Sequence, residues 1–146
     1  MFKWGSPKFA VRSAGSVSSA AGDDRPARAI RGTEAEDLAL RFLQRQGLRL
    51  VERNYQVAAG PGARAGEVDL ILQDRDGTVV FVEVRARAGL THGGAAASVT
   101  LKKQRNLIYA ATHYLLRHVS PPPCRFDVIA IDGEQVEWLV AAFDTE

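Results

Sequence analysis

The chain has 146 residues, of which 46% are hydrophobic and 25% are charged, and its formal net charge is +2. This length and apolar content suffice for one well-packed domain and are too small for two. The net charge is too low for overall attraction to nucleic acid, so such binding would need local basic clusters. The single cysteine, Cys124, excludes an internal disulfide and fits a reducing compartment such as the cytoplasm.

The amino-terminal segment differs from the rest of the chain. It lacks the continuous apolar centre of a secretory signal, and no stretch of the chain approaches the roughly 20 apolar residues that cross a bilayer. We therefore expect no membrane association. Because residues 1–28 are mostly small or charged, they bury too little surface to offset the entropy of ordering. We expect a disordered tail over 1–28 and one folded domain over 29–146.

The pattern changes at Thr33. The segment TEAEDLALRFLQRQG places apolar residues at helical spacing before Gly47, which predicts an amphipathic helix that ends at this glycine. Thr33 and Glu36 fit a capping box, which would give Glu36 a structural role. Residues 48–57 then predict a strand, and the glycines and proline of 58–66 predict a flexible loop.

The next segment predicts a β-hairpin that carries two acids. Residues 67–73 and 78–86 flank an Asp-Arg-Asp-Gly turn, and they contain Asp69 and Glu83. Each acid lies on one face of its strand, and the opposite face is aliphatic. That face is formed by Val68, Leu70 and Leu72 with Val80, Val82 and Val84. We therefore expect a sheet that is covered on both sides.

A second helix is predicted from Thr100 to His118, with a buried stripe of Leu101, Ile108, Ala111 and Leu115. Its start is crowded by the cations Lys102, Lys103 and Arg105, which are unfavourable at the positive end of the helix dipole. Two interpretations stay open, a solvated basic face and a contact with phosphate groups. After three prolines, residues 125–131 and 135–143 predict a final hairpin with Trp138 in the core.

The acids at positions 69 and 83 raise a chemical question, because an unpaired buried carboxylate costs several kcal/mol. Its charge can be met by a raised pKa, a cationic partner or a metal ion. Two carboxylates on neighbouring strands, with a carbonyl and waters, form the oxygen site that Mg²⁺ or Mn²⁺ prefers. Arg85, on the same strand face as Glu83, is the partner in a metal-free interpretation.

Six segments together resemble the YraN-like group of small bacterial proteins. They are GTEAEDLALRFLQRQG, ERNYQ, GEVDLI, FVEVRAR, KKQRNLIYAATHYL and RFDV, and they extend from Gly32 to Val128. This group is assigned to the restriction-endonuclease-like, or PD-(D/E)xK, nuclease superfamily and is similar to archaeal Holliday-junction resolvases. The resemblance implies an α/β fold with a mixed sheet and helices on both faces. The predicted order, helix, three strands, helix and two strands, agrees with that fold.

The resemblance further implies an endonuclease that needs Mg²⁺ or Mn²⁺ and acts on DNA, with branched DNA as a candidate substrate. Glu36, Asp69 and Glu83 would form the metal site, where the ion would polarise the scissile phosphate and lower the pKa of a water. The catalytic lysine of the superfamily falls on Arg85, and Gln104 would lie near the site. Resolvases are symmetric dimers, so a homodimer is also implied.

Arginine at position 85 departs from the superfamily pattern. A guanidinium group keeps the positive charge but does not give up a proton, so it cannot act as a base. The alternative is a non-catalytic module of the same fold that binds nucleic acid or protein and keeps the acids in a buried ion-pair cluster. Three converging acids beside one base would leave net negative charge, which favours a metal. Candidate contacts to phosphate are Arg64, Arg87, Lys102, Lys103 and Arg105, although Arg87 is better explained as a surface charge at a strand end.

Overall fold

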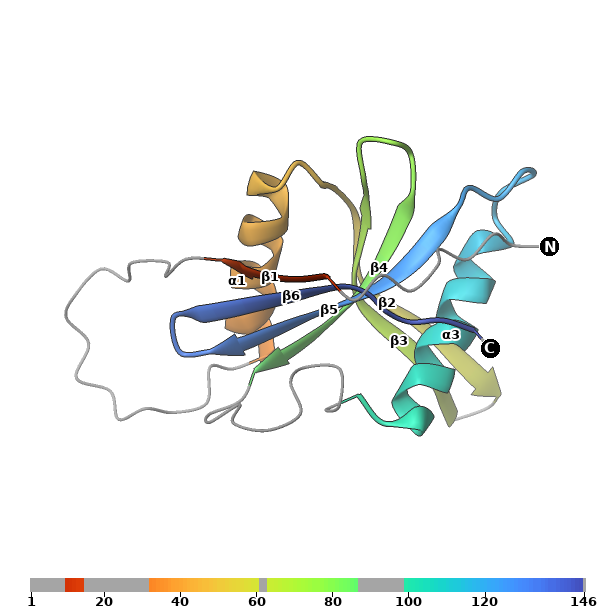
Figure 1. The fold of residues 1–146 in the computed structure, drawn as a ribbon. Coiled ribbons are helices and arrows are strands. Elements are labelled where there is room, and N and C mark those ends of the chain that lie inside the picture. Colours follow the sequence, from red (N-terminus) through yellow and green to blue (C-terminus); the bar gives the residue numbers. More distant parts are fainter. Residues whose placement is uncertain (1–9, 15–31, 61–62, 87–98, 146) are drawn as a thin grey trace.

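The structure is a computed structural model that describes residues 10–14, 32–60, 63–86 and 99–145. Its elements in chain order are β1 (Ala10–Ala14), α1 (Gly32–Arg45), β2 (Arg49–Gly60), β3 (Ala63–Gln73), β4 (Val79–Ala86), α3 (Leu101–Leu115), β5 (Cys124–Asp132) and β6 (Gln135–Phe143). Figure 1 shows how they are arranged. The strands form one sheet in the order β1-β6-β5-β4-β3-β2. The sheet is mixed, because β4 and β5 are parallel and the other neighbours are antiparallel. This confirms the predicted fold class and element order, with β1 added in front.

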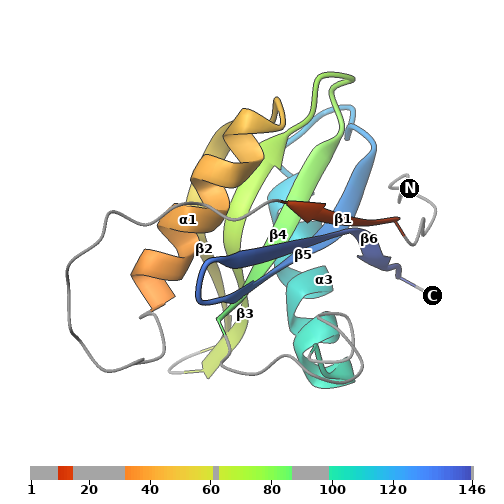
Figure 2. The same cartoon turned by 60° about the vertical axis from the view of Figure 1, so that its left-hand side comes forward.

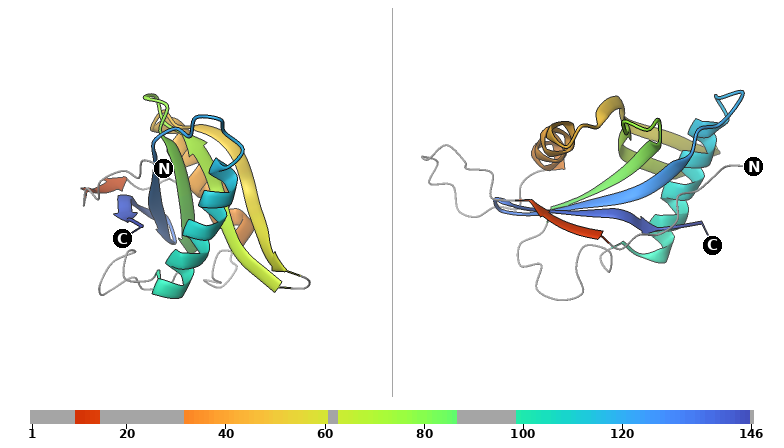
Figure 3. Two further views of the ribbon diagram at one scale, coloured as in Figure 1. Left: turned by 90° about the vertical axis from the view of Figure 1, so that its right-hand side faces the viewer. Right: turned by 45° about the horizontal axis from the view of Figure 1, so that its top comes forward.

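The two helices cover opposite faces of the sheet, as Figure 3 shows. On the α3 face the core contains Phe81 and Phe126, and on the α1 face it contains Val80, Val82 and Trp138. Successive residues of β4 thus point to alternate faces, as strand geometry requires. The expected coverage on both sides is confirmed, and Trp138 lies in the core as predicted. Within the described ranges, no helix has the length and apolar character needed to cross a membrane.

Helix α1 forms where the sequence predicts it. Its buried side consists of small and apolar residues at helical spacing, namely Ala35, Ala39, Phe42 and Leu43. The helix ends before Gly47, whose φ of 99° lies in the left-handed region that glycine adopts without steric cost. The capping-box prediction is wrong, because α1 begins at Gly32 and therefore includes both Thr33 and Glu36. The side chain of Glu36 is instead engaged with Arg53 of β2.

Helix α3 begins after Thr100, whose hydroxyl oxygen accepts a hydrogen bond of 3.2 Å from the backbone N–H of Lys103. Its buried stripe consists of Leu107, Ala110, Ala111, Tyr114 and Leu115. The prediction that Leu101 belongs to this stripe is wrong, since Leu101 is 69% exposed. Six residues before Leu107, it is turned by about 120° from the stripe in an α-helix.

The β2–β3 hairpin is longer than the sequence predicts. Most of the expected loop at 58–66 belongs to strands, since β2 continues to Gly60 and β3 begins at Ala63. The pairing contains register shifts near Ala58, which let a glycine-rich segment stay in the ladder. Arg64 pairs with Ala58 through its backbone, while its side chain lies outside the described residues.

The expected tail contains one strand that the sequence did not predict. Residues 10–14 form β1, which pairs antiparallel with β6 at the edge of the sheet, and Figure 2 shows the two side by side. The backbone groups of β6 on that side therefore have a partner, which an uncovered edge would lack. The other residues of 1–28 lie outside the described residues, as does 87–98 with Arg87.

Candidate active site

Strands β3 and β4 diverge at the two acids. Their paired residues run from Gln73↔Val79 to Leu70↔Val82, and Asp69 and Glu83 come next in the two strands. Here Asp69 Oδ2 accepts a hydrogen bond of 2.9 Å from the backbone N–H of Val84. The carboxylate thus accepts a hydrogen bond that a backbone carbonyl of the neighbouring strand accepts in a regular sheet. We call Asp69 and Glu83 the acidic pair.

The two faces of β3 also reverse at this point, so one detail of the prediction is wrong. Val68 was expected on the face of Leu70 and Leu72, yet it packs with Tyr55 in the α3-side core. Opposite Asp69 on β2 lies Asn54, which has a φ of 51°. Asparagine tolerates this left-handed conformation, and the turn it introduces reverses the faces of the residues that follow. The acidic pair therefore lies where side chains from both faces can approach.

Glu83 is the most deeply buried acid of the site, with 3% of its surface exposed. Its Oε1 lies 3.6 Å from Nε of Arg85 and 3.5 Å from Nζ of Lys103. Its Oε2 is buried and accepts no hydrogen bond. Burial and the neighbouring charge of Asp69 raise the pKa of Glu83 to about 8, against the opposing effect of the two cations.

Asp69 is half-buried, and burial raises the pKa of its carboxyl group. The N–H of Val84 acts in the opposite direction, because it favours the charged form. A hydrogen bond between the carboxyl groups of Asp69 and Glu83 lowers the pKa of the first and raises that of the second. In the absence of a metal, the acidic pair thus holds a proton that resides mainly on Glu83.

Glu36 of α1 lies near enough to Asp69 for their charges to interact. Its Oε2 lies 3.6 Å from Arg53 Nη2, which is closer to Asp37, at 2.8 Å. Burial and then the charge of Asp69 raise the pKa of Glu36. In the part of the chain that the structure describes, no three Asp, Glu, His or Cys side chains are grouped so as to hold a metal ion. The structure thus brings Asp69 and Glu83 together with Glu36 beside them, and shared metal ligation by all three stays a prediction.

The cations are distributed differently from the prediction. Lys102 and Arg105 are exposed on α3, as phosphate contacts require, whereas Lys103 reaches inward to Glu83. Gln104 Nε2 donates a hydrogen bond of 3.1 Å to the carbonyl oxygen of Val99, just before α3, and the catalytic role of Gln104 stays a prediction. Arg87 lies outside the described residues.

The charge balance also corrects the expectation from the sequence. Arg53, Arg85 and Lys103 each contact an acid of the site. The count of one adjacent base is therefore wrong, although Arg53 is shared with Asp37, so that three cations accompany four carboxylates. Neither Arg53 nor Lys103 could be assigned from spacing, because both contacts join elements that are distant in sequence.

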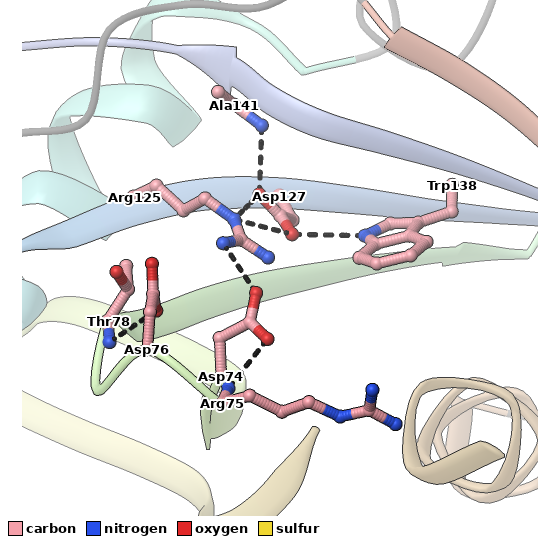
Figure 4. Close-up of polar contacts among 8 residues, drawn as sticks. All are labelled: Asp74, Arg75, Asp76, Thr78, Arg125, Asp127, Trp138 and Ala141. Carbon is pink, nitrogen blue, oxygen red and sulfur yellow. Dashed lines mark hydrogen bonds and ion pairs between the residues drawn. The ribbon is translucent and has the colours of Figure 1, made fainter. Parts of the chain in front are cut away.

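A second buried acid, Asp127 on β5, accepts hydrogen bonds on both of its carboxylate oxygens (Figure 4). Its Oδ1 accepts from Arg125 Nε at 3.0 Å and from the N–H of Ala141 at 2.9 Å. Its Oδ2 accepts from Trp138 Nε1 at 3.0 Å. Arg125 also donates to Asp74 in the β3–β4 turn, at 2.9 Å. Sequence reasoning missed this cluster, although an Asp within the apolar run RFDVIAI is the same signal that drew attention to Asp69.

The structural role of Asp127 follows from these contacts. It lies at a register shift between β5 and β6, where Ala141 has a φ of 51°. Its side chain accepts a hydrogen bond from the N–H of Ala141, which the irregular pairing leaves without a strand carbonyl. Asp69 does the same for the N–H of Val84. Both aspartates thus accept a hydrogen bond from a backbone N–H. Of the two, only Asp127 also accepts side-chain hydrogen bonds on both oxygens, from Arg125 and Trp138.

Comparison with known proteins identifies the family. The model of a family described as "Uncharacterised protein family UPF0102" matches residues 35–131, a range that contains the acidic pair, Glu36, Lys103 and Asp127. The chain belongs to UPF0102. This confirms the YraN-like family expected from the sequence motifs.

Other UPF0102 proteins are close in sequence. The chain is 64% identical over 113 residues to a UPF0102 protein of Methylibium petroleiphilum, an overlap of 77% of this chain and 93% of that relative. It is 58% identical over 113 residues to a UPF0102 protein of Paracidovorax citrulli, covering 77% of this chain and 82% of the relative. A UPF0102 protein of Albidiferax ferrireducens is 56% identical over 113 residues, with coverages of 77% and 86%.

Proposed function

We propose that this UPF0102 protein is a divalent-metal-dependent nuclease that hydrolyses phosphodiester bonds of DNA at the acidic pair. The supporting observation is the buried Oε2 of Glu83, to which no N–H group donates, so that the two carboxyl groups depend on a shared proton to relieve their charge. Asp127 shows that this fold can surround a buried carboxylate with donors where the role is structural. The acidic pair lacks that saturation, which suits a site that receives a cation.

The donor set fits Mg²⁺ or Mn²⁺, since both ions prefer carboxylate oxygens and retain waters as further ligands. Asp69 and Glu83 would hold the ion, with Glu36 at its side. Once bound, the ion would supply Lewis acidity at the scissile phosphate. Arg85, half-buried and next to Glu83, would place a fixed positive charge at the edge of the site.

The outer surface of α3 would hold the rest of the substrate. Lys102 and Arg105 are exposed, and α3 contains no acidic residue that would repel phosphate. Contacts of this kind position a nucleic acid without reading its sequence. Substrates of defined structure, including branched DNA, are therefore proposed on the resemblance to resolvases and not on any base contact.

The non-catalytic alternative also has a specific observation in its favour. Glu36 and Glu83 already contact cations, and arginine stands at the position of the superfamily lysine. Such a cluster could be a closed ion-pair network in a module that only binds nucleic acid or protein. It predicts binding that persists in chelator and no cleavage with any metal.

The deciding experiment measures cleavage of labelled linear, single-stranded and four-way-junction DNA in Mg²⁺, Mn²⁺ or chelator. We expect metal-dependent cutting by the parent and its loss in Glu83→Gln, which keeps the size of the side chain but removes its charge. Glu34→Gln is the matched control, since Glu34 is exposed on α1 and should leave cutting unchanged. Absence of cutting by the parent on every substrate, with binding retained in chelator, would favour the alternative. Sedimentation equilibrium of the same samples tests the homodimer.

A further inference from the structure

The proposed nuclease lacks a lysine on the strand that carries Glu83. In its place is Arg85, whose Nε lies 3.6 Å from Glu83 Oε1. A guanidinium group is a wide planar fork that favours carboxylates, whereas an ammonium group is a compact charge with three donors. The two cations are therefore not interchangeable at a site that must also admit a phosphate oxygen.

A lysine does reach the acidic pair, but from another element. Lys103 belongs to the first turn of α3, and its Nζ lies 3.5 Å from Glu83 Oε1. Its side chain is 29% exposed, whereas that of Glu83 is 4% exposed. The lysine side chain thus contacts both the buried carboxylate and solvent.

Two features fix the position of this lysine. The backbone N–H of Lys103 donates to the Thr100 side chain that caps α3, so the start of the helix is anchored. Further along, α3 rests directly on the backbone of β3 at Gly66, where an added Cβ would clash with the carbonyl oxygen of Asn106. The glycine allows the helix to lie close enough to the sheet for Lys103 to reach Glu83.

We propose that Lys103 is a catalytic residue of this protein, supplying from α3 the ammonium group that the superfamily places on the strand. The inference rests on the proposed nuclease function. In the reaction the oxygen of water bonds to phosphorus and one ester P–O bond breaks. The water gives a proton to solvent, and the departing sugar oxygen takes one up. Lys103 keeps its proton throughout and neutralises the charge that develops on a non-bridging phosphate oxygen.

The test compares kcat and KM of Lys103→Met, Lys103→Arg and Arg85→Met with the parent under the metal condition that supports cutting. Loss of one charge-stabilising donor lowers kcat by about 10²- to 10³-fold, so we expect that loss in Lys103→Met with little change in KM. Lys103→Arg should recover part of the loss because it keeps the charge, and Arg85→Met should lose less than Lys103→Met. Arg41→Met, a change on the exposed side of α1, is the control for removal of a surface cation.

The result that overturns the inference differs from the one that overturns the proposed function. If Glu83→Gln abolishes cutting and Lys103→Met keeps kcat within about threefold of the parent, only the role of Lys103 is rejected. A loss confined to KM would also reject it, since it would make Lys103 a binding residue. No metal-dependent cutting by the parent would reject the nuclease function and, with it, the catalytic role.

A measurement without catalysis tests the placement of the charge. Removal of a cation that lies 3.5 Å from Glu83 should make Mn²⁺ bind severalfold more tightly to Lys103→Met than to the parent, as measured by calorimetry. Equal affinities would show that the ammonium group is not at the acidic pair in solution and would overturn the inference. Circular dichroism melting of each variant shows whether α3 has stayed in place.

Discussion

Gly66 and Asn106 bring α3 against the sheet, since the α-carbon of the glycine faces the carbonyl oxygen of the asparagine with no room for a Cβ between them. The same Cβ would lie 3.0 Å from Cβ of Ala110 and 3.2 Å from its backbone nitrogen. These contacts are with helix backbone and with a Cβ that is fixed to it, and neither can rotate away as a long side chain can. Gly66 lies three residues before Asp69, so this tight contact of helix and strand is on the strand that carries one acid of the pair.

We therefore expect Gly66→Ala to destabilise the protein by about 1 to 3 kcal/mol, as overpacking of a tight contact does. It should also weaken any cleavage more than this loss of stability explains, because the helix that carries Lys103 must shift. Chemical denaturation and cleavage rates measure the two effects. Gly32→Ala is the matched control, since Gly32 has open space around its α-carbon and begins a helix, where alanine is favoured. Equal stability of the two variants would contradict the packing argument.

The raised pKa of Glu83 makes a prediction for stability against pH. Glu83 has an ordinary pKa of 4.5 and a pKa of about 8 in the folded protein. An acid with a raised pKa holds its proton more tightly when folded, so its stabilisation is present below 4.5 and is lost as pH rises through 8. At one pKa unit per 1.36 kcal/mol, the contribution lost is about 3 to 5 kcal/mol.

Urea denaturation in chelator at pH 5, 7 and 9 measures this loss. The parent should lose stability relative to Glu83→Gln across this range, because glutamine resembles the protonated acid at every pH. The difference between the two proteins reports the acidic pair, since Asp127 titrates in both whereas the pKa of Asp69 depends on Glu83. Parallel stability curves would show that the burial and the charge of Asp69 do not act on Glu83 as described.

The same pKa predicts that divalent cations compete with a proton. At pH 7 the acidic pair holds a proton, mainly on Glu83, and a cation that binds both carboxylates must displace it. Mn²⁺ binding should therefore tighten as pH rises through 8 and release about one proton at pH 7. Calorimetry in two buffers of different ionisation enthalpy counts the proton. Binding that is independent of pH, or that is unchanged in Asp69→Asn, would place the ion elsewhere.

The fold and the acidic pair were predictable because their signals are local. Alternation in β4 and the 3.6-residue period of α1 each appear within a dozen residues, and Asp69 and Glu83 interrupt apolar runs on one hairpin. Contacts between distant elements were not predictable in this way. Lys103 pairs with Glu83 only because α3 folds back onto the sheet at Gly66.

Backbone irregularities account for the other errors. The period-two pattern predicts that Val68 shares a face with Leu70, but Asn54 on the neighbouring strand has a left-handed conformation and the faces reverse there. Period-two patterns cannot anticipate such a reversal, because it depends on one residue of the partner strand. The strand at Ala10–Ala14 was missed because its composition is that of a tail and its order comes from pairing with β6.

The last prediction separates the structural acid from the site acids. Asp127→Asn should destabilise the protein by about 3 kcal/mol, the lower end of the cost of breaking a buried ion pair, because Arg125 then keeps only Asp74 as a charged partner. The exposed ion pair of Glu52 and Arg117 is the control, and Glu52→Gln should cost less than about 1 kcal/mol. Denaturation in chelator at pH 7 measures both changes.

The double variant Arg125→Gln/Asp127→Asn should cost less than the sum of its single changes, since the two residues are coupled. Additive losses would show that Asp127 acts mainly through Trp138 and Ala141, and would reassign its role from ion pair to hydrogen-bond acceptor.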